Sequence, residues 1–307
     1  MKKYSIINKC QISNDKKLKK IISLGYIPPV NSMITQKKGD YSESFFAPLE
    51  LYYSEKSKLV QLSAILNQNI LFPVSYPYTS STTKILRENF KELREEVDKK
   101  FNFKKNSLII DIGSNDGNLL SKFKDKYNVL GITPENIGKL AIKKGIPTII
   151  DYFNKKNSIK ILKKYGKAKI ITATNVFAHI ENINQIMIDI KRCLSQDGVF
   201  ITESHYLLTL LKTVQYDTIY HEHLRYYSLR SLKYLFEKHN LEIFDAKKIP
   251  THGGSIRVYC SKPGKNKISN SVYKILNEEK KINWNLFNKF KQETINSKLD
   301  LISLIKQ

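Results

Sequence analysis

Between residues 107 and 205 the sequence alternates five times between an apolar run and an amphipathic segment, and this alternation restricts the fold more than any other feature. The apolar runs are SLIIDIG, NVLGIT, PTIIDYF, AKIITATNVF and VFITESH. They are short and continuous, as strands buried in a parallel sheet are. The segments between them carry apolar residues at helical spacing. Strands that alternate with helices predict βαβ units around a mostly parallel sheet, as in Rossmann-like α/β folds.

The flanking segments complete the predicted organisation. A helix is predicted over 228–240, and the two strand candidates LEIFDAKKI and GSIRVYCSK follow it with only THGG between them. Such a short connection predicts an antiparallel pair at the edge of the sheet. We therefore expect a small N-terminal lobe over 1–75, an α/β domain over 76–264 that opens with a helix at 83–100, and a helical tail over 265–307.

The charge of the chain raises the hypothesis of nucleic-acid binding, because 52 Lys and Arg outnumber 28 Asp and Glu. Only six of the 52 are Arg, and the lysines are spread along the whole chain. A nucleic-acid surface favours Arg, whose planar guanidinium makes paired contacts with phosphates and bases. We interpret the charge as general lysine enrichment, which argues against a nucleic-acid partner. Part of it is still available to attract a diphosphate-bearing substrate.

Cysteine usage and hydropathy favour a cytoplasmic location. The three cysteines, Cys10, Cys193 and Cys260, are odd in number and far apart, which argues against a disulfide framework. No apolar run reaches the roughly eighteen residues of a membrane span, and the N-terminus lacks the features of a signal peptide. We therefore expect no membrane partner. No feature of the sequence indicates an oligomeric state.

A glycine-containing turn, Asp111-Ile-Gly113-Ser-Asn-Asp116-Gly117, directly follows the first predicted strand. Gly113 allows a sharp bend and close approach of the backbone to a ligand, and Gly117 allows tight packing where the next helix starts. The GxxxG spacing is neither the GxGxxG of dinucleotide binders nor a P-loop. The turn resembles the first motif of class I S-adenosylmethionine-dependent methyltransferases, where it holds the methionine part of the cofactor. A structural βα turn is the alternative interpretation.

The end of the second predicted strand lacks the acidic residue that normally holds ribose hydroxyls in such folds. Thr133 stands there instead and makes a weaker hydrogen bond than a carboxylate does. Glu135, two residues further on, is the candidate substitute.

Five of the six histidines lie in predicted loops or at strand ends, at positions 179, 205, 221, 223 and 252. In an open parallel sheet, ligands collect outside the carboxyl ends of the strands. The segment Tyr220-His221-Glu222-His223 also suggests metal ligation, but its HEH spacing is not the HExxH of helical zinc sites. Histidines that are hydrogen-bonded in a core are the remaining interpretation.

Five motifs together carry a resemblance to the sugar C-methyltransferases of deoxysugar and branched-sugar pathways. They are YPYTSST, DIGSNDGNLL, NVFAHIENI, YDTIYHEHLRYYS and THGGSIRVY, and the similarity extends from about residue 20 to about residue 265. The resemblance implies a class I methyltransferase fold with S-adenosyl-L-methionine as cofactor. It also implies a keto-sugar substrate on a nucleoside diphosphate, typically deoxythymidine diphosphate. In that reaction a base removes the proton beside the ketone, and the enolate carbon takes the methyl group.

The resemblance assigns roles to individual residues. The implied catalytic set is His223 as base, Glu222, Tyr220, His179, Tyr76 and Tyr78. The implied cofactor contacts are Asp111, Gly113, Ser114, Asn115, Asp116, Gly117, Thr133, Asn175 and Val176. The implied substrate contacts are His221, His252 and Tyr206, with His221 chiefly supporting its loop. The chemistry requires no metal, since a histidine near neutrality suits the base and a phenol suits the enolate oxygen.

The chain departs from this family in three places. The family's N-terminal lobe usually carries a four-cysteine zinc site, whereas here Cys10 stands alone and Ser54-Glu-Lys-Ser57 occupies the place of a CxxC pair. Thr133 replaces the ribose-binding acid, as described above. The family normally continues into a second Rossmann-like lobe, which we expect this chain to lack as a shortened variant, a fragment, or an enzyme with a smaller substrate.

Two other functions remain open from the sequence. An O- or N-methyltransferase acting on another small molecule would need no stabiliser for an enolate, which leaves the Tyr, His and Glu cluster without a purpose. A non-catalytic protein with this fold would bind a partner or RNA through its basic surface. Thr133, the missing cysteines and the absent lobe favour that interpretation, and the intact YHEH segment disfavours it.

Overall fold

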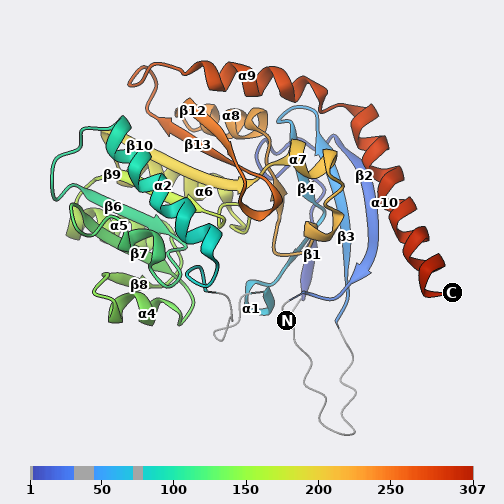
Figure 1. Ribbon diagram of the computed structural model, residues 1–307, viewed down its shortest axis with the longest axis horizontal. Coiled ribbons are helices and arrows are strands. Elements are labelled where there is room, and N and C mark those ends of the chain that lie inside the picture. The colour runs from blue at the N-terminus through green and yellow to red at the C-terminus, as the bar shows by residue number, and fades with distance from the viewer. Residues whose placement is uncertain (1–2, 31–44, 72–78, 307) are drawn as a thin grey trace, which may run out of the picture.

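The computed structural model describes residues 3–30, 45–71 and 79–306, and its largest sheet has seven strands (Figure 1). The strand order is β12-β13-β10-β9-β6-β7-β8. The bounds are β6 Leu108–Ile112, β7 Asn128–Thr133, β8 Thr148–Ile150, β9 Ala168–Thr174, β10 Leu194–His205, β12 Glu242–Ile249 and β13 Ser255–Ser261. Strands β6 to β10 pair in parallel, and β13 pairs antiparallel with β10 and β12. The predicted α/β class with an antiparallel edge pair is therefore confirmed.

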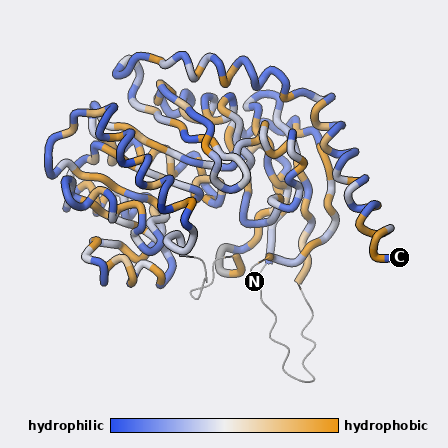
Figure 2. Tube along the Cα trace, viewed as in Figure 1, coloured by the Kyte–Doolittle hydropathy of each residue, from blue (hydrophilic) through white to orange (hydrophobic). Residues whose placement is uncertain are grey.

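Helices cover both faces of this sheet because its strands are apolar on both sides. Their bounds are α2 Lys84–Lys100, α3 Asn118–Ser121, α4 Gly138–Lys143, α5 Lys155–Tyr165, α6 Ile183–Cys193 and α8 Leu229–Lys238. Ile109 of β6 belongs to a core cluster with Leu93 of α2, whereas its neighbour Ile110 belongs to a cluster with Ile161 of α5 and Ile190 of α6. Successive strand residues thus point to opposite faces. In Figure 2 the strands are largely hydrophobic and the outer helices largely hydrophilic.

Two element boundaries differ from the predicted ones. The segment 118–127 was expected to form one helix, but α3 ends at Ser121 and the chain continues in turns up to β7. Strand β10 begins at Leu194, inside the segment that was predicted to complete a helix. Leu194 pairs with Ala168 of β9, and a register shift follows before Val199. The start of β10 is therefore determined by pairing with β9, which cannot be predicted from the helical spacing of apolar residues in the sequence.

The N-terminal residues form two small sheets. Strands β2 Leu18–Ile27, β3 Ala47–Ser54 and β4 Leu59–Leu62 pair antiparallel, and β1 Tyr4–Ile6 pairs with β5 Ala64–Leu66. The short helix α1 Gln68–Leu71 follows β5. The fourth strand of the larger of these sheets is β11, which is only Arg225–Tyr226 and comes from the loop before α8. The N-terminal lobe is therefore joined by backbone pairing to a distant segment of the chain.

The C-terminal residues contain α9 Asn270–Glu278 and α10 Trp284–Ile305, as expected of a helical segment. Helix α10 runs along β2 of the N-terminal lobe (Figure 1). The Phe287 ring lies 5.0 Å from the Tyr53 ring of β3, centroid to centroid. Phe287 and Phe290 are buried. The first part of this helix is therefore packed on the N-terminal sheet, and the division into three domains remains a prediction.

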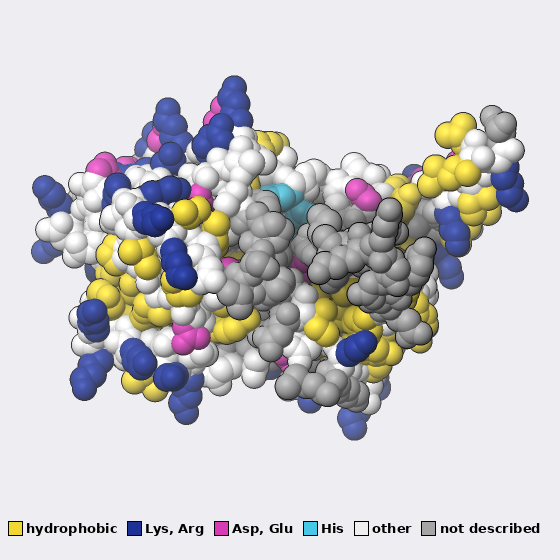
Figure 3. All heavy atoms as spheres, turned by 90° about the horizontal axis from the view of Figure 1, so that it is seen from below, with side chains coloured by type: hydrophobic (Ala, Val, Ile, Leu, Met, Phe, Trp, Pro, Cys, Tyr) yellow, Lys and Arg dark blue, Asp and Glu magenta, His cyan; other side chains and the backbone are white. Residues whose placement is uncertain are grey.

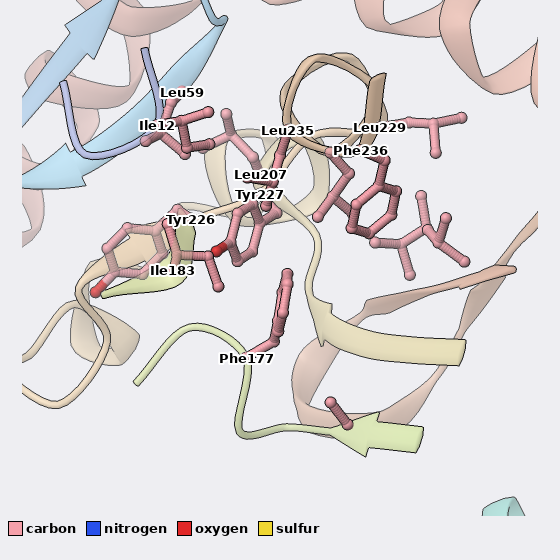
Figure 4. Close-up of a cluster of buried hydrophobic side chains, with 14 of the residues drawn as sticks. Ile12, Leu59, Phe177, Ile183, Leu207, Tyr226, Tyr227, Leu229, Leu235 and Phe236 are labelled. Atoms are coloured by element: carbon pink, nitrogen blue, oxygen red, sulfur yellow. The ribbon is translucent and has the colours of Figure 1, made fainter. Parts of the chain in front are cut away.

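One apolar core joins the N-terminal lobe to the seven-stranded sheet. Ile12 and Leu59 of the lobe belong to the same cluster as Phe177, Tyr227 and Phe236 (Figure 4). The Phe177 ring lies 5.8 Å from the Tyr227 ring. The region between lobe and sheet is thus filled by side chains, which fixes the loops that surround it. Among the residues described here, no helix is long and apolar enough to cross a membrane.

Candidate active site

A cavity of about 900 Å³ opens at the carboxyl ends of β6, β7, β9 and β10. Its walls also include the loop that carries residues 220–226, and His252 from the connection between β12 and β13. Histidine side chains are visible near the middle of the face shown in Figure 3, while Lys and Arg are scattered around the periphery. This is the edge at which the sequence predicted a ligand site.

The glycine turn forms one wall of the cavity. Gly113 has a φ of 73°, and a Cβ atom there would lie 2.7 Å from Cγ2 of Val176. The Gly113 amide donates to the carbonyl of Ile132 at 2.8 Å, which closes the bend against β7. The hydroxyl of Ser114 is buried without a hydrogen-bond partner among the described residues. A buried hydroxyl without a hydrogen-bond partner, next to a glycine backbone that no side chain covers, fits a ligand that supplies the missing hydrogen bond.

The cofactor residues predicted from the turn divide into two groups. Asp111, Gly113, Ser114, Asn115, Thr133, Asn175 and Val176 all line the cavity. Asp116 and Gly117 are not among its lining residues. Asp116 accepts from Ser80 Oγ at 2.6 Å and from Lys144 Nζ at 3.0 Å. A Cβ on Gly117 would lie 2.7 Å from Ile146. These two residues hold the turn in place from behind.

Asp111 is the buried acid at the end of β6. Thr172 Oγ1 donates to its carboxylate at 2.6 Å. Burial raises the pKa of Asp111 to about 7, the negative charge of Glu203 adds to the rise, and the Thr172 hydrogen bond only partly opposes it. A carboxyl that titrates near neutrality in a ligand cavity responds to any cation that binds beside it.

Thr133 and Glu135 lie together where a ribose acid was expected. The Thr133 hydroxyl donates to the carboxylate of Glu135, and both residues line the cavity. The Thr133 side chain is buried and Glu135 is partly exposed. The carboxylate is thus held at the end of β7 by its neighbour, and its role as the substitute for the ribose-binding acid remains a prediction.

His223 and Tyr220 form the central pair of the opposite wall. Nε2 of His223 lies 3.0 Å from the Tyr220 hydroxyl, and Nδ1 lies 3.2 Å from the carbonyl oxygen of Thr218. Burial lowers the pKa of His223 well below 6.5, and the neighbouring histidines add to this effect, so the ring is neutral at physiological pH. A carbonyl oxygen can only accept, so Nδ1 carries the proton and the lone pair of Nε2 accepts a hydrogen bond from the phenol.

Three further histidines surround this pair. The rings of His179 and His205 lie 4.9 Å and 5.1 Å from the His223 ring, and His252 lies 5.7 Å from His205. Burial lowers the pKa values of His179 and His205 to about 4, and it also lowers that of His252. Glu222 is buried and also lines the cavity. The group is therefore a set of neutral imidazoles with one carboxyl group.

The remaining predicted residues lie elsewhere. His221 is buried outside the cavity lining, and its Nε2 lies 3.3 Å from the Pro48 carbonyl, where it anchors the loop to β3. Tyr206 is also absent from the lining and is packed in the main core. Both side chains are buried and neither lines the cavity, so the geometry does not support their assignment as substrate contacts. Tyr76 and Tyr78 lie outside the described residues.

The N-terminal lobe holds the loop that presents His223. Arg225, which is fully buried, donates to the Gln11 side chain and to the Ile180 carbonyl. The Leu62 amide donates to the Leu224 carbonyl at 3.0 Å. Residues 224 and 225 are therefore held by hydrogen bonds to the N-terminal lobe and to the loop that follows β9.

The lining residues that the predicted site did not include contain a histidine and a buried arginine. His205 ends β10, and its ring stands between those of His223 and His252. Its position at the end of a predicted strand was the available signal. Arg225 follows the YHEH segment, and no motif marked it as a buried cation. Within the described part of the chain, no group of three or more His, Cys, Asp or Glu is arranged to hold a metal ion.

Comparison with known proteins identifies three family profiles along the chain. A profile described as "Methyltransferase domain" matches residues 85–246. One described as "Putative zinc binding domain" matches residues 10–72, and one described as "C-methyltransferase C-terminal domain" matches residues 250–307. The expectation that the C-terminal lobe is lacking is therefore wrong for residues 250–307. The residue pattern of α9 and α10 shows only a polar helical tail, and the profile starts at residue 250, in the short connection between β12 and β13, where the sequence gives no boundary signal.

The comparisons also identify individual proteins that are similar to this chain. The C-methyltransferase NovU of Streptomyces niveus is 29% identical over 257 residues, which are 83% of this chain and 61% of NovU. The chain thus spans about three fifths of that relative's length. A methyltransferase from Clostridium acetobutylicum is 14% identical and covers 60% of this chain and 94% of its own, with a TM-score of 0.45. Protein PH0226 of Pyrococcus horikoshii is 13% identical over 63% of this chain and 97% of its own, with a TM-score of 0.45.

Proposed function

Since the chain belongs to the class I S-adenosylmethionine-dependent methyltransferase family, whose domain profile spans residues 85–246, we propose that it methylates a carbon atom of a nucleotide-linked keto-sugar. The name of its relative NovU supports carbon as the acceptor atom. The keto-sugar comes from the motif resemblance.

One geometric observation carries this proposal: the Nε2 atom of a neutral imidazole accepts from a phenol at 3.0 Å, in the same cavity as the glycine turn. An O- or N-methyltransferase needs no group that stabilises an enolate. A C-methyltransferase acting beside a ketone needs both a base and a hydrogen-bond donor for the developing oxyanion. The His223 and Tyr220 pair supplies these two functions.

The residues of the chain act in a defined order. His223 Nε2 removes the proton from the carbon beside the ketone, the electron pair of that C–H bond forms the new C=C bond, and the π pair of the C=O bond moves onto the ketone oxygen. Tyr220 turns its hydroxyl hydrogen from Nε2 to this oxygen and stabilises the enolate. The nearby Glu222 carboxyl stabilises the imidazolium that results. When bound, S-adenosylmethionine supplies an electrophilic methyl group that the enolate carbon attacks.

The opposite wall holds the cofactor. The Gly113 bend leaves room for the methionine part, and the Ser114 hydroxyl is available to it. Glu135, held by Thr133, takes the ribose hydroxyls. Asp111 lies where the positive charge of the cofactor favours its ionised form.

The direct test is methyl transfer with ¹³C-labelled S-adenosylmethionine and a deoxythymidine-diphosphate keto-sugar. We expect NMR to place the label on a carbon adjacent to the ketone. The matched control is the same sugar with its ketone reduced to an alcohol, which has no acidic proton and should not react. Label found on oxygen or nitrogen would contradict the proposal, as would equal transfer to the reduced sugar.

A further inference from the structure

Two tight turns of the N-terminal lobe share the same geometry. One is Cys10-Gln-Ile-Ser13 and the other is Ser54-Glu-Lys-Ser57. In each, the backbone amide of the fourth residue points at the side chain of the first, at 3.4 Å for Cys10 Sγ and at 3.5 Å for Ser54 Oγ. In each, the next residue has a positive φ, 60° at position 14 and 57° at position 58. The turns are therefore structural equivalents, although only one begins with a sulphur.

The two turns face each other inside the lobe. Cys10 Sγ lies 3.1 Å from Ser57 Oγ, and this pair joins segments 47 residues apart. Cys10, Ser54 and Ser57 are completely buried. Burying these polar atoms would cost stability if they had no partners, so their mutual hydrogen bonds are what makes the cluster stable.

The position of the cluster is that of a metal site. Two C-x-x-C turns that face each other are the usual frame of a structural zinc ion, and residues 10–72 match a profile described as a zinc binding domain. In this chain three of the four ligand positions, 13, 54 and 57, carry serine. A zinc ligand must be deprotonated, which a thiol achieves readily and a serine hydroxyl does not.

The distance between the turns agrees with a direct contact in place of a bound metal ion. Ligand atoms around a tetrahedral zinc ion stand about 3.3 to 3.8 Å apart, given metal–ligand lengths of about 2.0 to 2.3 Å. The 3.1 Å between Cys10 Sγ and Ser57 Oγ is shorter than this and typical of a direct hydrogen bond. The residues present therefore do not fit zinc.

We propose that the N-terminal lobe of this chain is a metal-free form of a two-turn zinc lobe, in which the buried residues Cys10, Ser54 and Ser57, with the partly buried Ser13, replace the ion as the link between the turns. The direct hydrogen bond between Cys10 and Ser57, together with the apolar residues around the turns, takes over the role of metal coordination. The two facing turns are retained, but three of the four positions that would ligate zinc carry serine.

This replacement matters for the active-site loop. Gln11 lies within the first turn, and its side chain donates to the Leu224 carbonyl and accepts from Arg225. The turn therefore holds the segment directly after His223. A lobe that needs no metal keeps this support when zinc is scarce.

The first test uses the full chain as purified. We expect elemental analysis to find no stoichiometric zinc after incubation with ZnCl₂ and desalting, and EDTA to leave the Tm unchanged. Ser57→Ala removes the partner of Cys10 and should lower the Tm by about 2–6 °C. The matched control, Ser303→Ala, changes an exposed serine of α10 and should not alter the Tm. One tightly bound zinc per chain, or a Tm that EDTA lowers, would overturn the proposal.

The second test restores the missing sulphurs with Ser13→Cys, Ser54→Cys and Ser57→Cys together. If the frame is retained, this variant should bind one Co²⁺ per chain and give the intense visible absorption of a tetrahedral thiolate site. The Tm should then rise with metal and fall with EDTA. Adding Cys10→Ser to the triple variant should weaken Co²⁺ binding at least about tenfold. A folded triple variant that binds no Co²⁺ would show that the turns are not a former metal site. If the triple variant fails to fold, the wild-type zinc and EDTA measurements still decide whether the lobe is metal-free.

Discussion

Nε2 of His223 lies 3.0 Å from the hydroxyl of Tyr220, while Nδ1 of the same ring lies 3.2 Å from the carbonyl oxygen of Thr218. The carbonyl fixes the tautomer, so the lone pair of a neutral histidine is directed at a phenol. A cavity that only binds the cofactor needs no such pair, so the pair is the feature that indicates acid–base chemistry on a substrate. The predictions below test the two walls of the cavity, the support behind the loop and then the pair itself.

Gly113→Ala should weaken cofactor binding, because a Cβ there would meet Val176 at 2.7 Å and push the bend out of shape. Gly145 offers a matched control, since it has the same φ of 73° with nothing within 4 Å of an added Cβ. Both variants bear the strain of a positive φ, about 1–2 kcal/mol. Calorimetry should show at least about a tenfold loss of S-adenosylmethionine affinity for Gly113→Ala only. Equal losses in both variants would assign the effect to backbone strain.

Cofactor binding should release protons near neutral pH. The pKa of Asp111 is raised to about 7 by burial, so a fraction of this carboxyl is protonated when the cavity holds no cation. A cationic cofactor favours the ionised form, and affinity should therefore rise as pH increases from about 6 to about 8. Calorimetry in buffers of different ionisation enthalpy measures the released protons. Asp111→Asn should abolish the release, and an unchanged release in that variant would exclude Asp111 as its source.

Stability should fall as pH decreases below 6.5, before the carboxylates with lowered pKa values are protonated. The pKa values of His179 and His205 are lowered to about 4, so the unfolded chain binds more protons than the folded chain between these limits. Their contribution to stability is present above pH 6.5 and is lost as pH falls toward 4. The Tm measured from about pH 7.5 to about pH 4.5 should decrease, and less steeply in His205→Asn. A flat Tm profile for the wild type would contradict the burial of neutral imidazoles.

Gln11→Leu should lower kcat without changing the affinity for S-adenosylmethionine. The substitution removes the acceptor that faces buried Arg225, which costs about 1–3 kcal/mol and loosens the loop after His223. Gln11→Glu keeps an acceptor at this position and should restore kcat. Steady-state kinetics and calorimetry separate the two effects. An unchanged kcat in a folded Gln11→Leu variant would remove the N-terminal lobe from loop positioning.

Much of the fold follows from the sequence because apolar strands and amphipathic helices alternate regularly between β6 and β10. The same regularity places the ends of β6, β7 and β9 at one edge, which is why the glycine turn and His179 could be expected to meet. The start of β10 could not be predicted, since pairing of Leu194 with Ala168 decides it and helical spacing continues through it.

Other features depend on contacts between distant segments. Nothing in the pattern of α10 indicates that Phe287 packs on Tyr53. Tyr206 and His221 stand beside the recognised motifs, yet both side chains turn into the protein. The equivalence of Ser13 to a zinc ligand could not be predicted, because serine in place of cysteine removes the C-x-x-C motif from the sequence while the turn remains. His205 shows the reverse case, in which a strand end predicted the location without indicating the role.

The most direct test of the His223 and Tyr220 pair is hydrogen exchange at the carbon beside the ketone, without methyl transfer. A deoxythymidine-diphosphate keto-sugar is incubated with the protein in D₂O, with no cofactor added, and exchange is followed by NMR. We expect the wild type to exchange this proton, His223→Asn to lose at least about a hundredfold in rate, and Tyr220→Phe to lose about tenfold or more. His239→Asn changes a histidine outside the cavity, bonded to Asn184, and should exchange at the wild-type rate. Exchange that persists at the wild-type rate in His223→Asn would contradict the assignment of this imidazole as the base.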